Sequence, residues 1–67
     1  MQTIFMFQWP ARPEVARRVK EAVRDLSTAE PCFMRDLCAV AVGDEHILTF
    51  AEFCDANGIE WEAGIKA

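Results

Sequence analysis

Three cysteines and one histidine are the side chains best suited to metal binding or nucleophilic chemistry: Cys32, Cys38, Cys54 and His46. Structural zinc sites usually use ligands paired two to four residues apart, whereas at least five residues separate any two of these four. Cysteines are also often buried for packing alone. We therefore expect neither a metal site nor a cofactor.

A cysteine nucleophile would have to combine Cys54 with His46. Cys54 lies near the C-terminal end of a predicted helix and beside Asp55, where both the helix dipole and the carboxylate disfavour a thiolate. The carboxylates of Glu60 and Glu62 could support acid–base chemistry, but acids on edge strands are ordinarily solvated. A glycine-rich phosphate loop is absent, with three glycines in the whole sequence. We expect no enzymatic activity.

An odd number of cysteines without framework spacing is typical of free thiols in a reducing compartment. The apolar N-terminal stretch has no basic residue before it and ends at Pro10, which is too short for a signal peptide or a membrane span. The sequence therefore predicts a cytoplasmic protein. Its 67 residues predict a single domain over 1–67.

Charge is unevenly distributed along the chain. Five basic and three acidic residues leave 1–25 positive by two, while two basic and eight acidic residues leave 26–67 negative by six, which together give −4. An acidic C-terminal part repels nucleic acid and favours basic protein surfaces. In addition, 52% of the residues are hydrophobic, more than a lone domain of this size can bury, so we expect an interface.

The first half of the chain predicts a strand and a helix. Residues 3–9 favour a pleated strand with two apolar faces, one carrying Ile4 and Met6 and the other carrying Phe5, Phe7 and Trp9. Pro13 suits the first position of a helix that should end around residues 27–29, before Pro31. Valines recur at helical spacing between these ends.

The middle of the chain predicts a hairpin. The apolar run 37–42 favours a strand followed by a turn at Gly43 and Asp44, with 46–48 as the returning strand. A short helix over 31–39 is an alternative that the pattern leaves open.

The last third predicts a helix and a strand. Thr49 and Glu52 have the spacing of a capping box before a helix over 50–57, and Gly58 suits a left-handed C-terminal cap. The strand over 59–65 should direct Ile59, Trp61, Ala63 and Ile65 to one face, and Glu60 and Glu62 to the other.

These elements predict an α+β fold: a small two-layer sandwich in the order β-α-β-β-α-β, with an antiparallel sheet and two helices on one face. The order resembles that of ferredoxin-like domains. Small copper-carrying members place Cys-x-x-Cys after the first strand, where this chain has Trp9-Pro10-Ala11-Arg12-Pro13. RNA-recognition members carry stacking aromatics on the third strand, where this chain has His46-Ile47-Leu48. Neither family's signature is present, and no family is assigned.

A sheet covered by helices on one face leaves the other face available for binding. We expect Glu60 and Glu62 there, next to an apolar set from the first strand, either Ile4 and Met6 or Phe5, Phe7 and Trp9. Apolar side chains bordered by carboxylates are typical of a protein interface. The partner-binding residues predicted from the sequence are therefore Glu60, Glu62, Ile4 and Met6, and the partner is a basic protein surface or, alternatively, a second copy of the chain.

Arg17, Lys20 and Arg24 share one face of the first helix and form an alternative, basic surface. Nucleic acid is the less favoured partner for it, because acids are interleaved with the bases and the sequence predicts no exposed aromatic beside them. An ordinary solvated helix face is favoured instead.

The sequence therefore favours a non-enzymatic protein-binding module that acts by stoichiometric occupancy. An acidic domain of this size would suit an inhibitor encoded by a phage or mobile element, similar in kind to an anti-CRISPR protein, that acts on a host nucleic-acid-handling complex. The alternative is a small dimeric regulatory or assembly subunit that contacts nucleic acid through its basic helix face.

Overall fold

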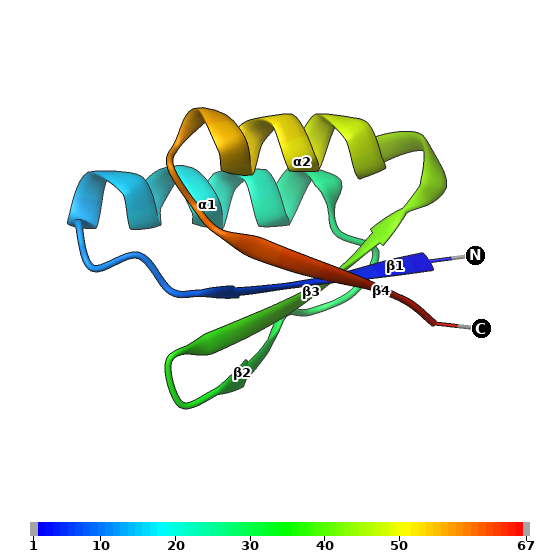
Figure 1. Cartoon of the computed structure of the whole chain (residues 1–67), viewed down its shortest axis with the longest axis horizontal. Coiled ribbons are helices and arrows are strands. Elements are labelled where there is room, and N and C mark those ends of the chain that lie inside the picture. Colours follow the sequence, from blue (N-terminus) through cyan, green and yellow to red (C-terminus); the bar gives the residue numbers. More distant parts are fainter. Residues whose placement is uncertain (1, 67) are drawn as a thin grey trace.

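Both helices of the protein lie against one face of a four-stranded antiparallel sheet (Figure 1). The computed structural model describes the backbone of residues 2–66 and the side chains of residues 2–64. In chain order the elements are β1 (Gln2–Gln8), α1 (Pro13–Leu26), β2 (Cys32–Met34), β3 (Leu37–Gly43), a 3-10 turn (Asp44–His46), α2 (Ile47–Ala56) and β4 (Trp61–Lys66). The strands are ordered β2-β3-β1-β4. The prediction of a small α+β fold with a four-stranded antiparallel sheet and two helices is confirmed.

The core lies between the helices and the sheet. It forms because side chains along the two central strands, β1 and β3, point alternately toward the helices and away from them. β1 directs Phe5 and Phe7 toward the helices, and β3 directs every second residue the same way. The Phe50 ring of α2 packs on both of these β1 rings, with its centroid 4.9 Å from that of Phe5 and 6.1 Å from that of Phe7. The remaining buried hydrophobic residues among those described are Cys38, Val40, Val42, Val19, Val23 and Cys54.

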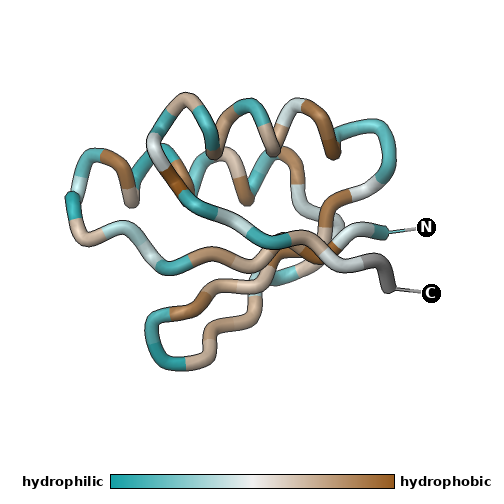
Figure 2. Tube along the Cα trace, in the orientation of Figure 1, coloured by the Kyte–Doolittle hydropathy of each residue, from teal (hydrophilic) through white to brown (hydrophobic). Residues whose placement is uncertain are grey.

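α1 begins at the predicted residue. Pro13 occupies the first helical position, where its missing N–H leaves no hydrogen bond unmade. Val19 and Val23 are buried against the sheet, while hydrophilic residues alternate with them along the helix (Figure 2). The helix ends at Leu26, and the amide of Ser27 donates to the carbonyl of Val23 at 2.9 Å.

The C-terminal end of α2 is formed as predicted, whereas its beginning is not. Gly58 has a φ of +68°, its amide donates to Asp55, and the amide of Ile59 donates to Cys54, which together make a Schellman cap. The predicted capping box is wrong, because the helix begins at Ile47 and Thr49 lies within its first turn. The 3-10 turn leads the chain directly from β3 into the helix, and Ile47 already packs on the core.

The hairpin lies earlier in the chain than the sequence predicts. β3 pairs with β2 through a two-residue turn at Arg35 and Asp36. The predicted return strand 46–48 is wrong, because these residues end the 3-10 turn and begin α2, and the alternative helix over 31–39 is wrong as well. After Gly43 the chain enters the helix layer and does not return to the sheet beside β3. The edge of β3 that faces away from β1 therefore pairs with β2, the strand that precedes β3 in the sequence.

β4 lies beside β1, which is therefore paired on both sides. The antiparallel pairing of β1 with β4 extends from Phe7 opposite Trp61 to Gln2 opposite Lys66. The Trp61 ring packs under the helices, 5.0 Å from the Phe5 ring, as the alternation predicts. The strand begins two residues later than predicted, because Ile59 belongs to the cap of α2. The predicted inward position of Ile65 lies outside the described side chains.

Candidate functional site

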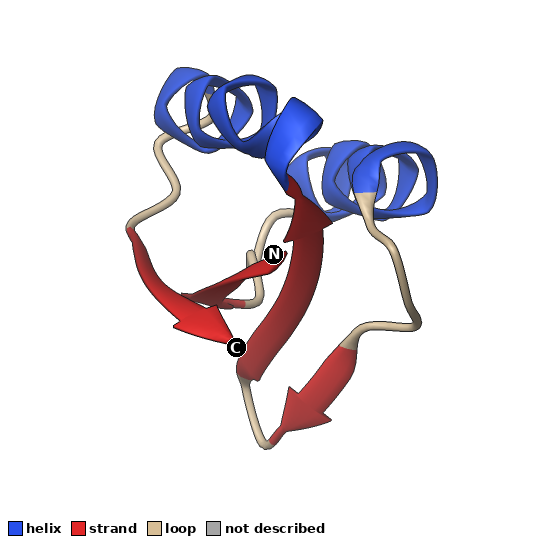
Figure 3. Ribbon diagram, turned by 90° about the vertical axis from the view of Figure 1, so that its right-hand side faces the viewer, coloured by secondary structure: helices blue, strands red, loops and turns tan. Residues whose placement is uncertain are grey.

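Within residues 2–66, no helix or loop covers the second face of the sheet, which we call the open sheet face (Figure 3). Ile4 and Met6 project to it, because Phe5 and Phe7 on the same strand project to the core. This result selects one of the two apolar sets that the sequence offered. On β3, the residues on this face are Leu37, Ala39 and Ala41.

The register places the exposed apolar side chains next to one another. Met6 lies between Ala39 on β3 and Glu62 on β4, and Leu37 lies between Gln8 and Met34. The exposed fractions are 42% for Met6, 46% for Leu37 and 71% for Met34. In Figure 2, hydrophobic colour runs through both strands of the β2–β3 hairpin and is interrupted at its tip. Two neighbouring rows therefore form an exposed apolar patch, which Glu62 borders at the end of the Met6 row and Gln8 at the end of the Leu37 row.

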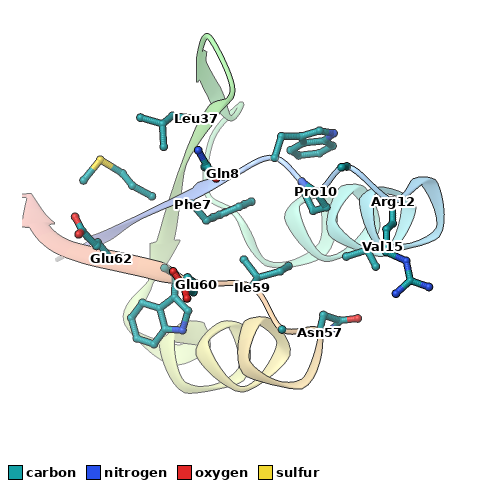
Figure 4. Close-up of a pocket in the computed structure, with 15 residues that line it drawn as sticks. Phe7, Gln8, Pro10, Arg12, Val15, Leu37, Asn57, Ile59, Glu60 and Glu62 are labelled. Carbon is teal, nitrogen blue, oxygen red and sulfur yellow. The ribbon is translucent and has the colours of Figure 1, made fainter.

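One end of the open sheet face deepens into a groove of about 1000 Å³, which we call the carboxylate groove (Figure 4). It forms because the two neighbouring chain segments diverge. β1 continues along β3 beyond Phe7, with the amide of Trp9 donating to the carbonyl of Asp36 at 2.7 Å. On the other side, β4 pairs with β1 only from Trp61 onward, and the preceding residues turn away into the cap of α2.

The walls of the carboxylate groove are apolar and its charged groups are mainly acidic. Met6, Leu37 and Trp61 line it together with Glu60 and Glu62. Both glutamates are exposed, and they enter from the β4 side (Figure 4).

Arg12 is the one cationic side chain among the described residues that line the groove, and it is already engaged. Its Nη2 lies 2.8 Å from Oε1 of Glu14, and its Nε donates to the same oxygen at 2.9 Å. The two glutamates on the β4 side therefore give the groove its electrostatic character.

Three of the four predicted partner-binding residues, Met6, Glu60 and Glu62, thus line one groove. Ile4 does not line it. It lies further along the open sheet face between Ala41 and Gly64, and it is half-buried.

Sequence reasoning missed Leu37 and Met34, two of the most exposed apolar side chains on this face. Their positions depend on the hairpin, which the sequence placed later in the chain. Alternation along the apolar run 37–42 would have assigned Leu37 to the face of Met6 once β1 and β3 were known to pair.

Arg17, Lys20 and Arg24 are exposed on α1, where the helical spacing predicted them. Lys20 and Arg24 also line a second, smaller pocket between α1 and β2. Arg18 faces another way, with its Nη1 donating to Oδ1 of Asn57 at 3.3 Å. The expectation that no exposed aromatic accompanies the basic face is wrong, because Phe33 lines the same pocket and is 53% exposed.

The cysteines occupy different environments. Cys32 is exposed, while Cys38 and Cys54 are buried in the core. Burial, reinforced by the nearby Cys32, raises the pKa of Cys38 to about 11. Burial and the neighbouring Asp55 raise the pKa of Cys54 to about 11 as well. Neither buried sulfur therefore forms an appreciable thiolate near neutral pH.

Within the described residues, no three His, Cys, Asp or Glu side chains gather closely enough to hold a metal ion. His46 is partly exposed, and its Nε2 lies 4.0 Å from Oε1 of Glu45. Neither helix within residues 2–66 is long and apolar enough to cross a membrane.

Comparison of the chain with protein-family models, with curated proteins and with solved structures found no match.

Proposed function

We propose that this chain is a non-enzymatic protein-binding module that acts by stoichiometric occupancy, and that its binding surface is the carboxylate groove with the adjoining open sheet face. The observation that carries the proposal is a patch of exposed apolar side chains, Met6, Leu37 and Met34, which occupy two neighbouring rows of the sheet. Glu62 borders the patch beside Met6, and no element within residues 2–66 covers this face. Exposed apolar side chains with a polar border characterise protein interfaces.

The partner fitting this surface is a protein segment that combines basic and apolar side chains. Glu60 and Glu62 would meet lysines or arginines, while Met6, Leu37 and Trp61 would contact apolar atoms. Complementary charge steers association and selects against acidic partners. Basic surfaces of this kind occur where proteins hold nucleic acid, which is why we propose an inhibitor of a host nucleic-acid-handling complex, similar in kind to an anti-CRISPR protein.

We further propose that the fold is ferredoxin-like. The strand order β2-β3-β1-β4, with antiparallel neighbours and both helices on one face, supports this assignment. A sheet of this kind offers a rigid open face, so partner side chains can bind without reorganising the backbone.

The experiment is affinity capture from nuclease-treated lysate of the native host, with the tagged protein as bait. We expect a nucleic-acid-independent protein that associates in a fixed ratio. The double variant E60K/E62K should lose this partner. The matched control E21K/E52K makes the same charge change at exposed positions on the two helices and should retain it.

Two results would contradict the proposal. One is a partner that E60K/E62K and E21K/E52K retain equally, because binding would then not use the carboxylate groove. The other is the recovery of the bait alone, with a molar mass in light scattering that corresponds to a dimer, because a second copy would then cover the open sheet face.

A further inference from the structure

The pocket between α1 and β2, on the helix side of the molecule, is separate from the carboxylate groove. It has a volume of about 570 Å³, within the range of ordinary small-ligand sites. Trp9, Val23 and Phe33 provide its apolar surface, and the loop of residues 27–31 closes one side. We call it the aromatic pocket.

The two aromatic rings of this pocket are in contact, yet they remain available to a ligand. The Trp9 and Phe33 centroids lie 5.3 Å apart with an interplanar angle of 69°. This edge-to-face contact holds Phe33, which comes from a strand of three residues at the sheet edge. With 53% of Phe33 exposed, the pocket presents an aromatic surface to solvent.

Cationic side chains stand beside the rings. Lys20 and Arg24 line the pocket, and Arg17 continues the same helix face one turn earlier. Two acids accompany them: Glu30 also lines the pocket, and Asp25 Oδ1 accepts from Arg24 Nε at 3.3 Å. The remaining donors of the Arg24 guanidinium and the Lys20 ammonium can bind an anion.

We propose that the aromatic pocket binds an unpaired nucleotide, with its base against Phe33 and its phosphate at Lys20 and Arg24. A ligand with both a flat π-system and an anionic group uses every feature of the site. An acidic peptide would use the cations but leave the aromatic surface unmatched. Aromatic stacking next to a basic track is how proteins bind single strands without reading their sequence.

This inference is independent of the proposed protein-binding function, because the groove and the pocket share only Trp9 among their described lining residues. The nucleotide could be free or part of a single strand, and the two sources share the same base and phosphate chemistry. A single strand has further phosphates that can reach Arg17, whereas a free mononucleotide has only the phosphate held at Lys20 and Arg24.

The experiment measures fluorescence anisotropy of a labelled 12-nucleotide oligodeoxythymidylate at low salt, with unlabelled oligouridylate and uridine monophosphate as competitors. We expect saturable binding that weakens with salt, with a slope of about −0.7 in log–log form for each phosphate contacted. Phe33→Leu, which keeps an apolar side chain but removes the ring, should weaken binding at least about fivefold. The double variant K20Q/R24Q should weaken binding by a similar factor and flatten the salt slope.

The matched control is Arg18→Gln, which removes one cation from the other side of the same helix and should change affinity less than about twofold. Circular dichroism of each variant verifies that the fold is retained. Competition by the monophosphate at a concentration similar to that of oligouridylate identifies a free nucleotide as the ligand, and competition by the oligomer alone identifies a single strand.

Three results would overturn the inference. They are the absence of saturable binding, an effect of Arg18→Gln equal to that of K20Q/R24Q, and displacement of the oligomer by polyglutamate more effectively than by oligouridylate. The second result would mean diffuse charge attraction, and the third would mean an acidic protein ligand.

Discussion

Trp61 Nε1 donates a hydrogen bond to Oδ1 of Asp55 at 3.0 Å, which joins the first residue of β4 to the last turn of α2. The backbone between them forms the Schellman cap at Gly58 and then carries Glu60. The side-chain bond and the cap together fix the β4 wall of the carboxylate groove. The geometry of the carboxylate groove therefore depends on the hydrogen bond between Trp61 and Asp55, which lies outside the core.

Removing the Asp55 carboxylate should loosen this wall with only a small loss of stability. Asp55→Ala is expected to lower the free energy of unfolding by about 0.5 kcal/mol, because the bond is exposed to water. This corresponds to a fall in Tm of about 2–4 °C. Asp55→Asn keeps an acceptor oxygen and should remain near the wild type. Thermal unfolding followed by tryptophan fluorescence measures both, and equal losses would exclude the hydrogen bond as the cause.

The three thiols should differ sharply in reactivity. At pH 8 we expect iodoacetamide to modify one cysteine rapidly, namely the exposed Cys32. Cys38 and Cys54 should react only on unfolding, because they are buried and their pKa values are raised to about 11. Intact-mass spectrometry with and without urea counts the modified sites. A second rapid modification in the folded protein would contradict the buried positions of these sulfurs.

Stability should fall at alkaline pH. The pKa of Cys38 and of Cys54 rises from 9.0 to about 11 on folding, so between these values the unfolded chain loses thiol protons that the folded chain retains. The unfolded state then binds fewer protons, and the free energy of unfolding decreases as pH rises from about 9 to 11. Below pH 9 the thiols are protonated in both states, and their full contribution to the free energy of unfolding is present.

Urea denaturation from pH 8 to 11 measures this dependence. The double variant C38A/C54A should be less stable below pH 9 because it leaves cavities, but its stability should decline less steeply above pH 9. Equal slopes for the two proteins would assign the alkaline loss to other groups.

The hairpin explains why part of the fold could not be predicted. Gly43 and Asp44 carry a familiar turn signal, whereas the actual turn contains Arg35 with a φ of +57°, a conformation that usually requires glycine or asparagine. The pairing of β3 with β1 over seven positions determines which edge of β3 remains for β2. The local propensities of residues 32–43 contain no information about which edge of β3 pairs with β1 and which with β2.

Arg35→Gly should therefore stabilise the protein. Relief of the left-handed conformation is expected to exceed the entropic cost of glycine and to add about 0.5–1 kcal/mol. Thermal unfolding should show a Tm higher by about 4 °C. Arg35→Ala removes the same charge without relieving the backbone and should show no such gain, so a similar gain in both variants would refute the backbone explanation.

Phe50 should be the most sensitive core position. Its ring is fully buried and contacts the rings of Phe5, Phe7 and Phe53. Phe50→Ala should cost about 3–5 kcal/mol, which is comparable to the total stability of a domain this size. We expect the loss of cooperative unfolding in urea followed by circular dichroism.

Leu48 lies on the same helix and is 71% exposed, which makes Leu48→Ala the control for the Phe50 substitution. It should change the free energy of unfolding by less than about 0.5 kcal/mol. A cooperative Phe50→Ala protein, or a Leu48→Ala protein as unstable as it, would contradict the packing described for α2.

Local signals were sufficient where one residue determines the backbone, as at Pro13 and Gly58, and where alternation determines a face, as for Trp61 and Glu62. Alternation along β1 separated two apolar sets but did not determine which of them faces away from the helices. They could not reveal the carboxylate groove, because it arises from the divergence of β1 and β4 beyond Phe7. The aromatic pocket was equally hidden, since it needs Phe33 on the edge strand β2, and the sequence predicted no strand over residues 32–34.

The central position of β1 has a consequence for how the chain folds. β1, the first strand of this fold, is held between β3 and β4, and Gln2 pairs with Lys66. Contacts between such distant segments raise the contact order and slow folding relative to a helical protein of the same length. The β1–β4 pairing cannot form until β4 is synthesised, so this four-stranded sheet is completed only after translation of residues 61–66.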